Sequence, residues 1–345
     1  MQDVRTDAVR GQRASVQPSA RTVAALAIVA VWGALALRSP SAHAGSWTPS
    51  PGHTQVPLWP ATVPDALPGA AATAETMEVV TEELIAGKPY VEILNVSRPT
   101  LTVYSPARSP ARPDPASAAV VVFPGGGYKA LAIDLEGTEV CDWLTAKGIT
   151  CVLLKYRVPN SGNHWDEQCK CHINPPVPTA LQDAQRALGL VRLHAAEWHI
   201  DPHKVGVLGF SAGGHLTAAI STHFEQRLYP AVDAADKQSC RPDFAVSLYP
   251  GHLWTNEDKL ELTPDVPVTK RTPPTLLLHA ENDDVDDVRH SLVYYLALKN
   301  AGVPAELHLY AEGGHAFGLR RTRHPITRWP QLVESWLAAI GMIAP

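Results

Sequence analysis

The sequence lacks an excess of basic residues. Its 345 residues include 29 Lys and Arg against 34 Asp and Glu, and residues 45–345 alone carry 24 basic and 32 acidic residues. Nucleic acids and anionic membrane surfaces bind clustered Lys and Arg, so a chain of this sign offers them no electrostatic footprint. We therefore expect no nucleic-acid partner. The sequence also shows no internal repeat, which excludes a solenoid or a propeller.

The sequence has no apolar run of the ~20 residues that a transmembrane helix needs. Its longest candidate, residues 23–37 (VAALAIVAVWGALAL), follows an Arg-bearing segment and precedes Ala42-His-Ala44, a small-x-small cleavage pattern. We expect residues 1–44 to be a signal peptide cleaved after Ala44. The mature protein would then be periplasmic or secreted, without stable membrane association. The alternative is a single N-terminal membrane anchor.

Cysteine is scarce and odd in number, which leaves at least one thiol unpaired. The five are Cys141, Cys151, Cys169, Cys171 and Cys240. No second Cys/His pair follows Cys169-Lys-Cys171-His172 at zinc-ligand spacing, so that motif favours a loop disulfide over a metal site. We expect no bound metal, and the sequence does not fix the pairing of the cysteines.

Proline, by contrast, is abundant, with 31 residues, six of them between residues 45 and 70. This density predicts an extended leader over 45–75, followed by a catalytic domain over 76–345. Two short strands are expected within 91–103. Beyond them, apolar runs at 119–123, 150–156, 204–210, 243–249, 275–279 and 305–310 alternate with helical periodicity at 134–147, 179–198, 212–222, 288–300 and 329–340.

This alternation predicts an α/β fold with a mostly parallel central sheet and helices on both faces. Two segments, 158–178 and 250–273, show no regular pattern. Long irregular loops in compact domains often have functional roles, so we expect these two to form the walls of a substrate pocket.

Gly209-Phe-Ser-Ala-Gly213 matches G-x-S-x-G at the junction of a predicted strand and a predicted helix. The match is weak as a bare string, but this context is the strand–turn–helix in which a nucleophilic serine is held in a strained, exposed turn. The alternative is an ordinary serine in a glycine-rich turn. The context favours Ser211 as a nucleophile.

A nucleophilic serine needs a base and an acid that orients it. His315 follows the last predicted strand, and Asp283 and Asp284 follow the strand before it, which gives the order Ser…Asp…His of α/β-hydrolases. We favour Asp283, with Asp284 next. Asp286 and Asp287 are further candidates, but acidic residues are common at the start of a helix for electrostatic reasons alone.

The glycine run Pro124-Gly-Gly-Gly-Tyr128 follows the first strong strand. Such a loop can turn backbone N–H groups toward the oxyanion that forms during ester cleavage. The N–H of Ala212 is the expected partner donor. A phosphate-binding loop is the alternative, but G-K-[ST] is missing and no G-x-G-x-x-G opens a helix.

Together these residues resemble the α/β-hydrolase superfamily, and within it the exported acetylxylan esterase-like carbohydrate esterases, a group close to small esterase/lipase and feruloyl esterase families. The resemblance covers nearly all of 56–340 and rests on Leu58-Trp-Pro60, 124–128, Leu135-Glu-Gly137, Trp143-Leu144, 154–159, 180–187, 206–215, 279–291 and 312–318. Pro124 stands where lipase-type loops have His. Asp286-Asp287 stands where such families usually have Val-Pro.

The resemblance implies a cofactor-free serine carboxylesterase with Ser211 as nucleophile, Asp283 as acid and His315 as base. It implies Gly126 and Gly127 as oxyanion donors.

The implied substrate is acetylated plant cell-wall polysaccharide, most of all acetylxylan. Tyr128, Trp165 and Trp254 are candidate substrate-binding residues. The two tryptophans lie in the two irregular segments and are candidate sugar-stacking platforms, with ordinary packing as the alternative. Alternatives are a general short-chain or feruloyl esterase, a serine peptidase of the prolyl-oligopeptidase type, and a carbohydrate-binding protein on an inactive hydrolase fold.

Overall fold

The computed structural model describes residues 43–44, 46–66, 73–107, 116–158, 164–166, 171–173, 178–254 and 258–344. Only the backbone is described for 43–44, 164–166 and 171–173. Cys169 and the expected signal peptide up to residue 42 lie outside these ranges. Within them, no helix is both long and apolar enough to span a bilayer.

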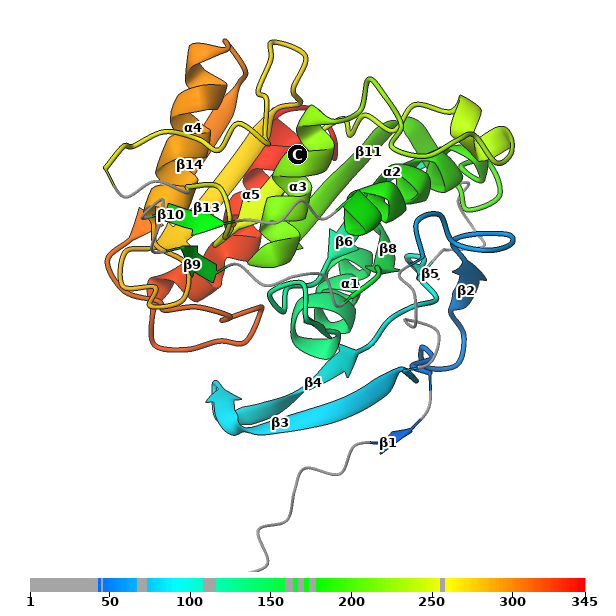
Figure 1. The fold of residues 1–345 in the computed structure, drawn as a ribbon, viewed down its shortest axis with the longest axis horizontal. Coiled ribbons are helices and arrows are strands. Elements are labelled where there is room, and N and C mark those ends of the chain that lie inside the picture. Colours follow the sequence, from blue (N-terminus) through cyan, green and yellow to red (C-terminus); the bar gives the residue numbers. More distant parts are fainter. Residues whose placement is uncertain are drawn as a thin grey trace, which may run out of the picture. The chain divides into compact units, whose positions relative to one another are not determined.

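An eight-stranded sheet forms the centre of the described chain (Figure 1). Its order is β14-β13-β12-β11-β6-β8-β5-β2, with β6, β8 and β11 to β14 parallel and β5 antiparallel to both of its neighbours. The strands are β2 (Thr54–Pro57), β5 (Thr100–Tyr104), β6 (Ser117–Phe123), β8 (Thr150–Lys155), β11 (Ile200–Phe210), β12 (Ala245–Leu248), β13 (Thr275–Ala280) and β14 (Ala305–Tyr310).

The central strands are buried along nearly their whole length. Every residue of β8, β12 and β13 is buried, and so is every residue of β6 except the first. Strands that are covered on both faces need apolar side chains at consecutive positions, which is the pattern that the apolar runs of the sequence show. The predicted mostly parallel α/β fold is therefore confirmed.

The helices pack around this sheet. They are α1 (Glu139–Ala146), α2 (Pro178–Leu193), α3 (Ala212–Thr222), α4 (Arg289–Asn300) and α5 (Trp329–Ala339). A π-helix, Asp134–Thr138, leads into α1, and two 3-10 helices span Ala234–Lys237 and Pro325–Arg328. Helices α2 and α3 lie side by side and both contact β11 (Figure 1).

One predicted helix is too long. We expected it to continue to residue 198, but α2 ends at Leu193, and turns carry the chain to β11. His199 has a φ of 54°, a left-handed conformation that a helix cannot contain. The burial of Trp198 explains the error, because its apolar side chain continued the helical spacing after the helix had ended.

A second sheet is antiparallel and has the order β1-β3-β4-β7. It contains β1 (His43–Ala44), β3 (Thr76–Ile85), β4 (Lys88–Leu94) and β7 (Ala130–Ala132). Strands β9 (His164–Asp166) and β10 (Cys171–Ile173) pair with each other. Strand β2 lies within the segment predicted as a leader, so the main sheet begins inside that segment.

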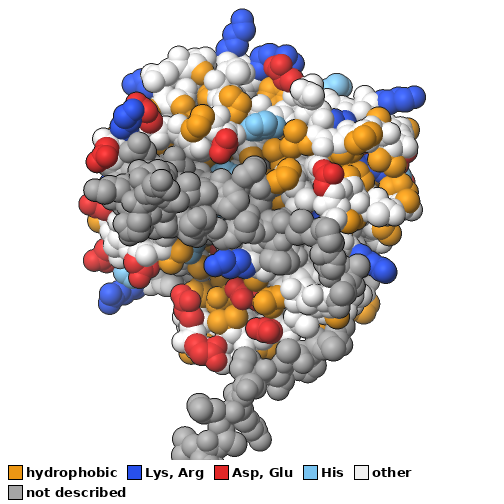
Figure 2. All heavy atoms as spheres, viewed as in Figure 1, with side chains coloured by type: hydrophobic (Ala, Val, Ile, Leu, Met, Phe, Trp, Pro, Cys, Tyr) orange, Lys and Arg blue, Asp and Glu red, His pale blue; other side chains and the backbone are white. Residues whose placement is uncertain are grey.

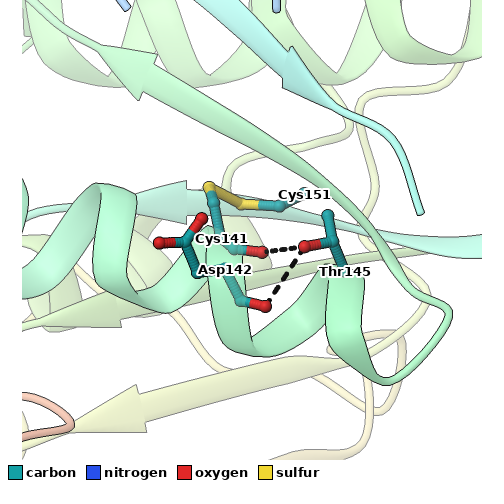
Figure 3. Close-up of a disulfide and its surroundings, with 4 residues drawn as sticks. All are labelled: Cys141, Asp142, Thr145 and Cys151. Atoms are coloured by element: carbon teal, nitrogen blue, oxygen red, sulfur yellow. Dashed lines mark hydrogen bonds between the residues drawn. A yellow bond between two sulfur atoms is a disulfide. The ribbon is translucent and has the colours of Figure 1, made fainter. Parts of the chain in front are cut away.

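Helix α1 and strand β8 are joined by a disulfide between Cys141 and Cys151 (Figure 3). Beside it, the Thr145 hydroxyl donates to the carbonyl oxygen of Cys141 at 2.8 Å. Cys240 is a buried free thiol. Among the described residues, no group of three His, Cys, Asp or Glu side chains could hold a metal ion. On the face in Figure 2, basic side chains are interspersed with acidic ones.

Candidate active site

The sequence-predicted site residues follow parallel strands of the main sheet. Ser211 follows β11, Asp283 comes after β13, and His315 comes after β14. The glycine loop over 124–128 follows β6, which pairs with β11. Because the carboxyl ends of parallel strands meet at one edge of a sheet, the topology brings all four segments to the same edge.

Ser211 occupies a sharp turn with φ 52° and ψ −120°, an unfavourable conformation for a residue with a side chain. Two close backbone approaches hold this turn. A Cβ atom at Gly209 would lie 2.0 Å from the Gly213 carbonyl oxygen, and one at Gly213 would lie 2.0 Å from that of Phe123. The two flanking glycines of G-x-S-x-G are therefore required by packing.

A chain of hydrogen bonds links the three predicted residues. His315 Nδ1 lies 2.7 Å from Asp283 Oδ2, and His315 Nε2 lies 3.0 Å from Ser211 Oγ. The ionised carboxylate only accepts hydrogen bonds, so Nδ1 donates and Nε2 is left free to accept from the serine hydroxyl. Asp283 is buried, whereas Asp284 is exposed, so the structure brings the first of the two predicted acids to His315.

The surroundings of this chain shift its pKa values. Burial alone would raise the pKa of Asp283, but hydrogen bonds from His279 and His315 outweigh it and hold that pKa well below its usual range. Burial alone would lower the pKa of His315, but the hydrogen bond to Asp283 and the charges of Asp286 and Asp283 raise it above its ordinary value. Asp283 is thus charged at neutral pH and favours a positive charge on His315.

Backbone hydrogen bonds fix the acid and join its loop to that of the base. Asp283 Oδ1 accepts from the N–H groups of Val285 and Asp286, both at 2.9 Å. Asn282 Oδ1 accepts from the N–H groups of Gly313 and Gly314, also both at 2.9 Å. Sequence reasoning missed Asn282, because nothing in the spacing of residues shows that two loops 31 residues apart share one amide.

The glycine loop lies directly against the serine. A Cβ atom at Gly125 would lie 2.9 Å from Ser211 Cβ, and Gly126 has a φ of 126°, which favours glycine. The Gly126 carbonyl accepts from the N–H groups of Lys129 and Ala130 at 2.9 and 3.0 Å. Within the described part of the chain, the N–H groups of Gly126 and Gly127 have no hydrogen-bond partner.

A buried carboxylate lies beneath this loop. Glu136 accepts from the Gly125 N–H at 2.7 Å and from the Tyr249 hydroxyl at 2.8 Å. Burial raises the pKa of Glu136, and its two hydrogen bonds only partly oppose this. The Tyr249 ring in turn contacts that of His315, with 4.9 Å between centroids. Glu136 lies within a motif quoted for the family resemblance, but nothing in the sequence indicated its place in the site.

Two of the three candidate substrate-binding residues are buried. Tyr128 is buried, and its hydroxyl lies 2.6 Å from Nδ1 of His215. Trp254 is buried too, donates from its indole N–H to the Lys259 carbonyl, and has the Arg289 guanidinium over its ring. This differs from the stacking platform that we expected of Trp254, because its ring is enclosed by packing.

Trp165 lies in β9, opposite His172 of β10, and the structure describes only its backbone. Two further histidines near the site, His215 and His279, are buried and hydrogen-bonded.

The chain is similar to known proteins along much of its length. Over 249 residues it is 31% identical to an acetylxylan esterase of Xylanibacter ruminicola, an alignment that covers 66% of this chain and 46% of that protein. The chain thus spans about half the length of that curated relative.

Two solved structures share its fold. An acetyl ester-xyloside bifunctional hydrolase from Caldicellulosiruptor lactoaceticus superposes with a TM-score of 0.62 at 30% identity, over 84% of this chain and 97% of that one. An α/β hydrolase from a Medee basin deep-sea metagenome library superposes with a TM-score of 0.56 at 26% identity, over 77% and 98%. The fold is therefore that of the α/β-hydrolases, as the sequence predicted. The prolyl oligopeptidase family matches residues 138–340, and this chain belongs to that family.

Proposed function

We propose that this protein is a serine esterase that removes acetyl groups from plant cell-wall polysaccharide, with acetylxylan as its main substrate. The observation that carries the proposal is the run of hydrogen bonds from Asp283 through His315 to Ser211 at the turn after β11. The printed names of two relatives, an acetylxylan esterase and an acetyl ester-xyloside hydrolase, support the choice of an acetylated xylan substrate.

In the proposed mechanism His315 Nε2 takes the proton of the Ser211 hydroxyl as its oxygen attacks the acetyl carbonyl carbon. The charge of Asp283 stabilises the imidazolium that forms. The tetrahedral intermediate collapses as His315 returns the proton to the departing sugar oxygen, which leaves an acetyl ester on Ser211. Water, deprotonated by His315, then hydrolyses this ester and releases acetate.

The oxyanion of each tetrahedral intermediate would be held by the N–H groups of Gly126, Gly127 and Ala212. Ala212 is the first residue of α3, so its N–H has no acceptor within the helix. Preorganised donors of this kind contribute about 3–4 kcal/mol each to the lowering of the barrier. Glu136 supports this role because it accepts from the Gly125 N–H and so fixes the loop that presents its neighbours.

The family also leaves a serine peptidase as an alternative, since the family is named after a peptidase. Serine, histidine and aspartate in this arrangement can also cleave peptide bonds. A feruloyl or other short-chain esterase is a further alternative with the same chemistry. These alternatives differ in the substrate that is cleaved and share the same nucleophile, so only an assay of several substrate classes can separate them.

The first prediction tests the nucleophile and the substrate together. We would measure acetate released from acetylated xylan, cleavage of an aryl acetate, and cleavage of a proline-containing peptide. We expect the wild-type protein to cleave both acetates and not the peptide, and Ser211→Ala to lose at least about a thousandfold in rate. Ser221→Ala, at the other end of α3, is the matched control and should keep full activity.

Cleavage of the aryl acetate alone would leave Ser211 in its role and exclude xylan as the substrate. Cleavage of the peptide would favour the peptidase. Equal activity of Ser211→Ala and the wild type would show that Ser211 is not the nucleophile.

A further inference from the structure

A second carboxylate touches the proposed nucleophile. Asp286 Oδ2 lies 3.2 Å from Ser211 Oγ, so the serine hydroxyl can donate to Asp286 as well as to His315. Asp286 Oδ2 also lies 3.8 Å from His315 Nε2, and its side chain is only 13% exposed. It is one of the two residues that replace Val-Pro in the pattern that the sequence otherwise resembles.

The surrounding backbone fixes Asp286 in this place. Its N–H donates to Asp283 Oδ1 at 2.9 Å, and its carbonyl oxygen accepts from His279 Nε2 at 2.9 Å. A Cβ atom at Gly251 would lie 2.5 Å from Asp286 Oδ1, so the absence of a side chain at Gly251 makes room for the carboxylate. Asp286 is therefore held against the serine by the same loop that positions Asp283.

The Asp286 carboxylate loses its hydrogen-bond donor during the proposed reaction. The Ser211 hydroxyl has one hydrogen, and in the productive arrangement it points to His315. Among the described residues no Lys or Arg lies within ion-pair distance of Asp286, and no second donor reaches its side chain. Once Ser211 has given its proton to His315 it has no hydrogen to donate, although the alcohol part of the ester is still bound, and a mostly buried carboxylate without a donor is costly.

The missing donor lies where the leaving alcohol would be. His315 Nε2 must reach the departing ester oxygen in order to protonate it, and Asp286 Oδ2 is 3.8 Å from that nitrogen. In a partly acetylated sugar, the carbon next to the ester-bearing carbon carries a free hydroxyl. That hydroxyl lies beside the ester oxygen and can donate to Asp286.

We propose that Asp286 is a specificity-determining residue that accepts a hydrogen bond from a free hydroxyl next to the ester, and so selects acetylated sugars over esters of alcohols without such a hydroxyl. This inference rests on the proposed function. It makes the leaving alcohol, and not the acyl group alone, part of what the site recognises.

The test compares two substrates in four proteins. One is a methyl xyloside that carries a single acetyl group next to a free hydroxyl, and the other is its analogue in which a hydrogen replaces that hydroxyl. Initial rates, taken before the acetyl group migrates, give kcat/KM for both in the wild type, Asp286→Ala, Asp286→Asn and Asp284→Asn. Asp284→Asn makes the same charge change in the same loop on an exposed side chain. An aryl acetate serves as a reference for each protein.

We expect the wild type and Asp284→Asn to favour the hydroxyl-bearing substrate by about tenfold to a hundredfold, the range for a hydrogen bond to a charged group. Asp286→Ala should bring the ratio close to one while it still cleaves the aryl acetate. Asp286→Asn, which keeps one acceptor oxygen but not the charge, should give an intermediate ratio.

A wild-type ratio near one, or the same ratio in the wild type and Asp286→Ala, would overturn the inference and leave the esterase proposal standing. If the wild type cleaves no ester at all, the proposed function fails, and this inference fails with it.

Discussion

At the scale of single residues, the protonation state of His315 sets the pH range in which the proposed reaction can run. Three carboxylates act on it: Asp283 and Asp286 from the loop after β13, and Glu136 from the π-helix before α1. The ring of Tyr249, directly after β12, packs against the imidazole. Burial of the imidazole opposes the three carboxylates, but their combined effect is larger, and the pKa of His315 is raised.

We therefore expect kcat/KM to fall on acidification with a midpoint above 6.5, the ordinary pKa of histidine. The base must be neutral to accept the serine proton, so a raised pKa moves loss of activity to a higher pH. Asp286→Asn removes one of the charges that favour the imidazolium, so the midpoint should move to a lower pH. The measurement is the pH dependence of kcat/KM for an aryl acetate.

Asp287→Asn is the control for this shift. The Asp287 carboxylate pairs with Arg289 at 2.7 Å, and its charge is not among those that act on His315. Its midpoint should match that of the wild type. An unchanged midpoint in Asp286→Asn would mean that the charge of Asp286 has no influence on the base.

At the scale of secondary-structure elements, the junction of β11 with α3 is the most constrained part of the site. A Cβ atom at Gly209 would lie 2.0 Å from the Gly213 carbonyl oxygen and 2.7 Å from Thr217 Oγ1. The first of these is backbone in the opening turn of α3, so it cannot move without displacing the helix and the serine with it.

We therefore expect Gly209→Ala to lower the free energy of unfolding by about 4 kcal/mol or more and to abolish activity. Gly302→Ala is the matched control. Gly302 follows α4 with a φ of 73° and no atom within 4 Å of an added Cβ, so its cost is limited to the left-handed backbone, about 1–2 kcal/mol, with activity retained. Urea unfolding and aryl acetate cleavage measure both effects. Similar losses in the two variants would contradict the packing argument.

The elements of the main sheet could be predicted because burial on both faces leaves a direct mark on the sequence. The apolar run at 119–123 became most of β6, and helix α3 has the bounds that were predicted for it. The hairpin of β3 and β4 was only partly predicted. Five of the ten residues of β3 are polar, so no continuous apolar run marks this strand. Its pairing with β4 rests on backbone hydrogen bonds across a tight turn, which no residue pattern records.

Some residues of the candidate site could likewise be predicted from the sequence, and others could not. Ser211 and His315 stand in local motifs that the chemistry requires, so the sequence alone predicts them. Asn282, Glu136 and Asp286 act through contacts with loops that are distant in the chain, and no local spacing records those contacts. Asp286 was noticed as a departure from a family pattern, but only the fold brings it to the serine.

At the scale of the whole molecule, the expected cleavage site after Ala44 can be compared with the contacts that the chain makes on either side of it. Strand β1 consists of His43 and Ala44 and pairs with one edge of β3. Just after it, the Trp47 N–H and the Ser46 hydroxyl donate to Glu75 Oε1 at 2.6 and 3.2 Å. Glu75 in turn pairs with the buried Lys155 at 2.7 Å. The chain is therefore attached to the main sheet from Ser46 onward, independently of β1.

We propose that export removes residues 1–44. Of the residues that the structure describes, cleavage after Ala44 would remove just the two of β1, and it would leave the contacts of Glu75 intact. The disulfide between Cys141 and Cys151 is consistent with an oxidising compartment. The full chain, produced in a bacterial host that exports proteins, should yield a product that starts at Gly45, as measured by its intact mass. Ala44→Leu, which removes the small residue before the cut, should keep the signal peptide attached. A wild-type product that retains residues 1–44 would instead favour the membrane anchor.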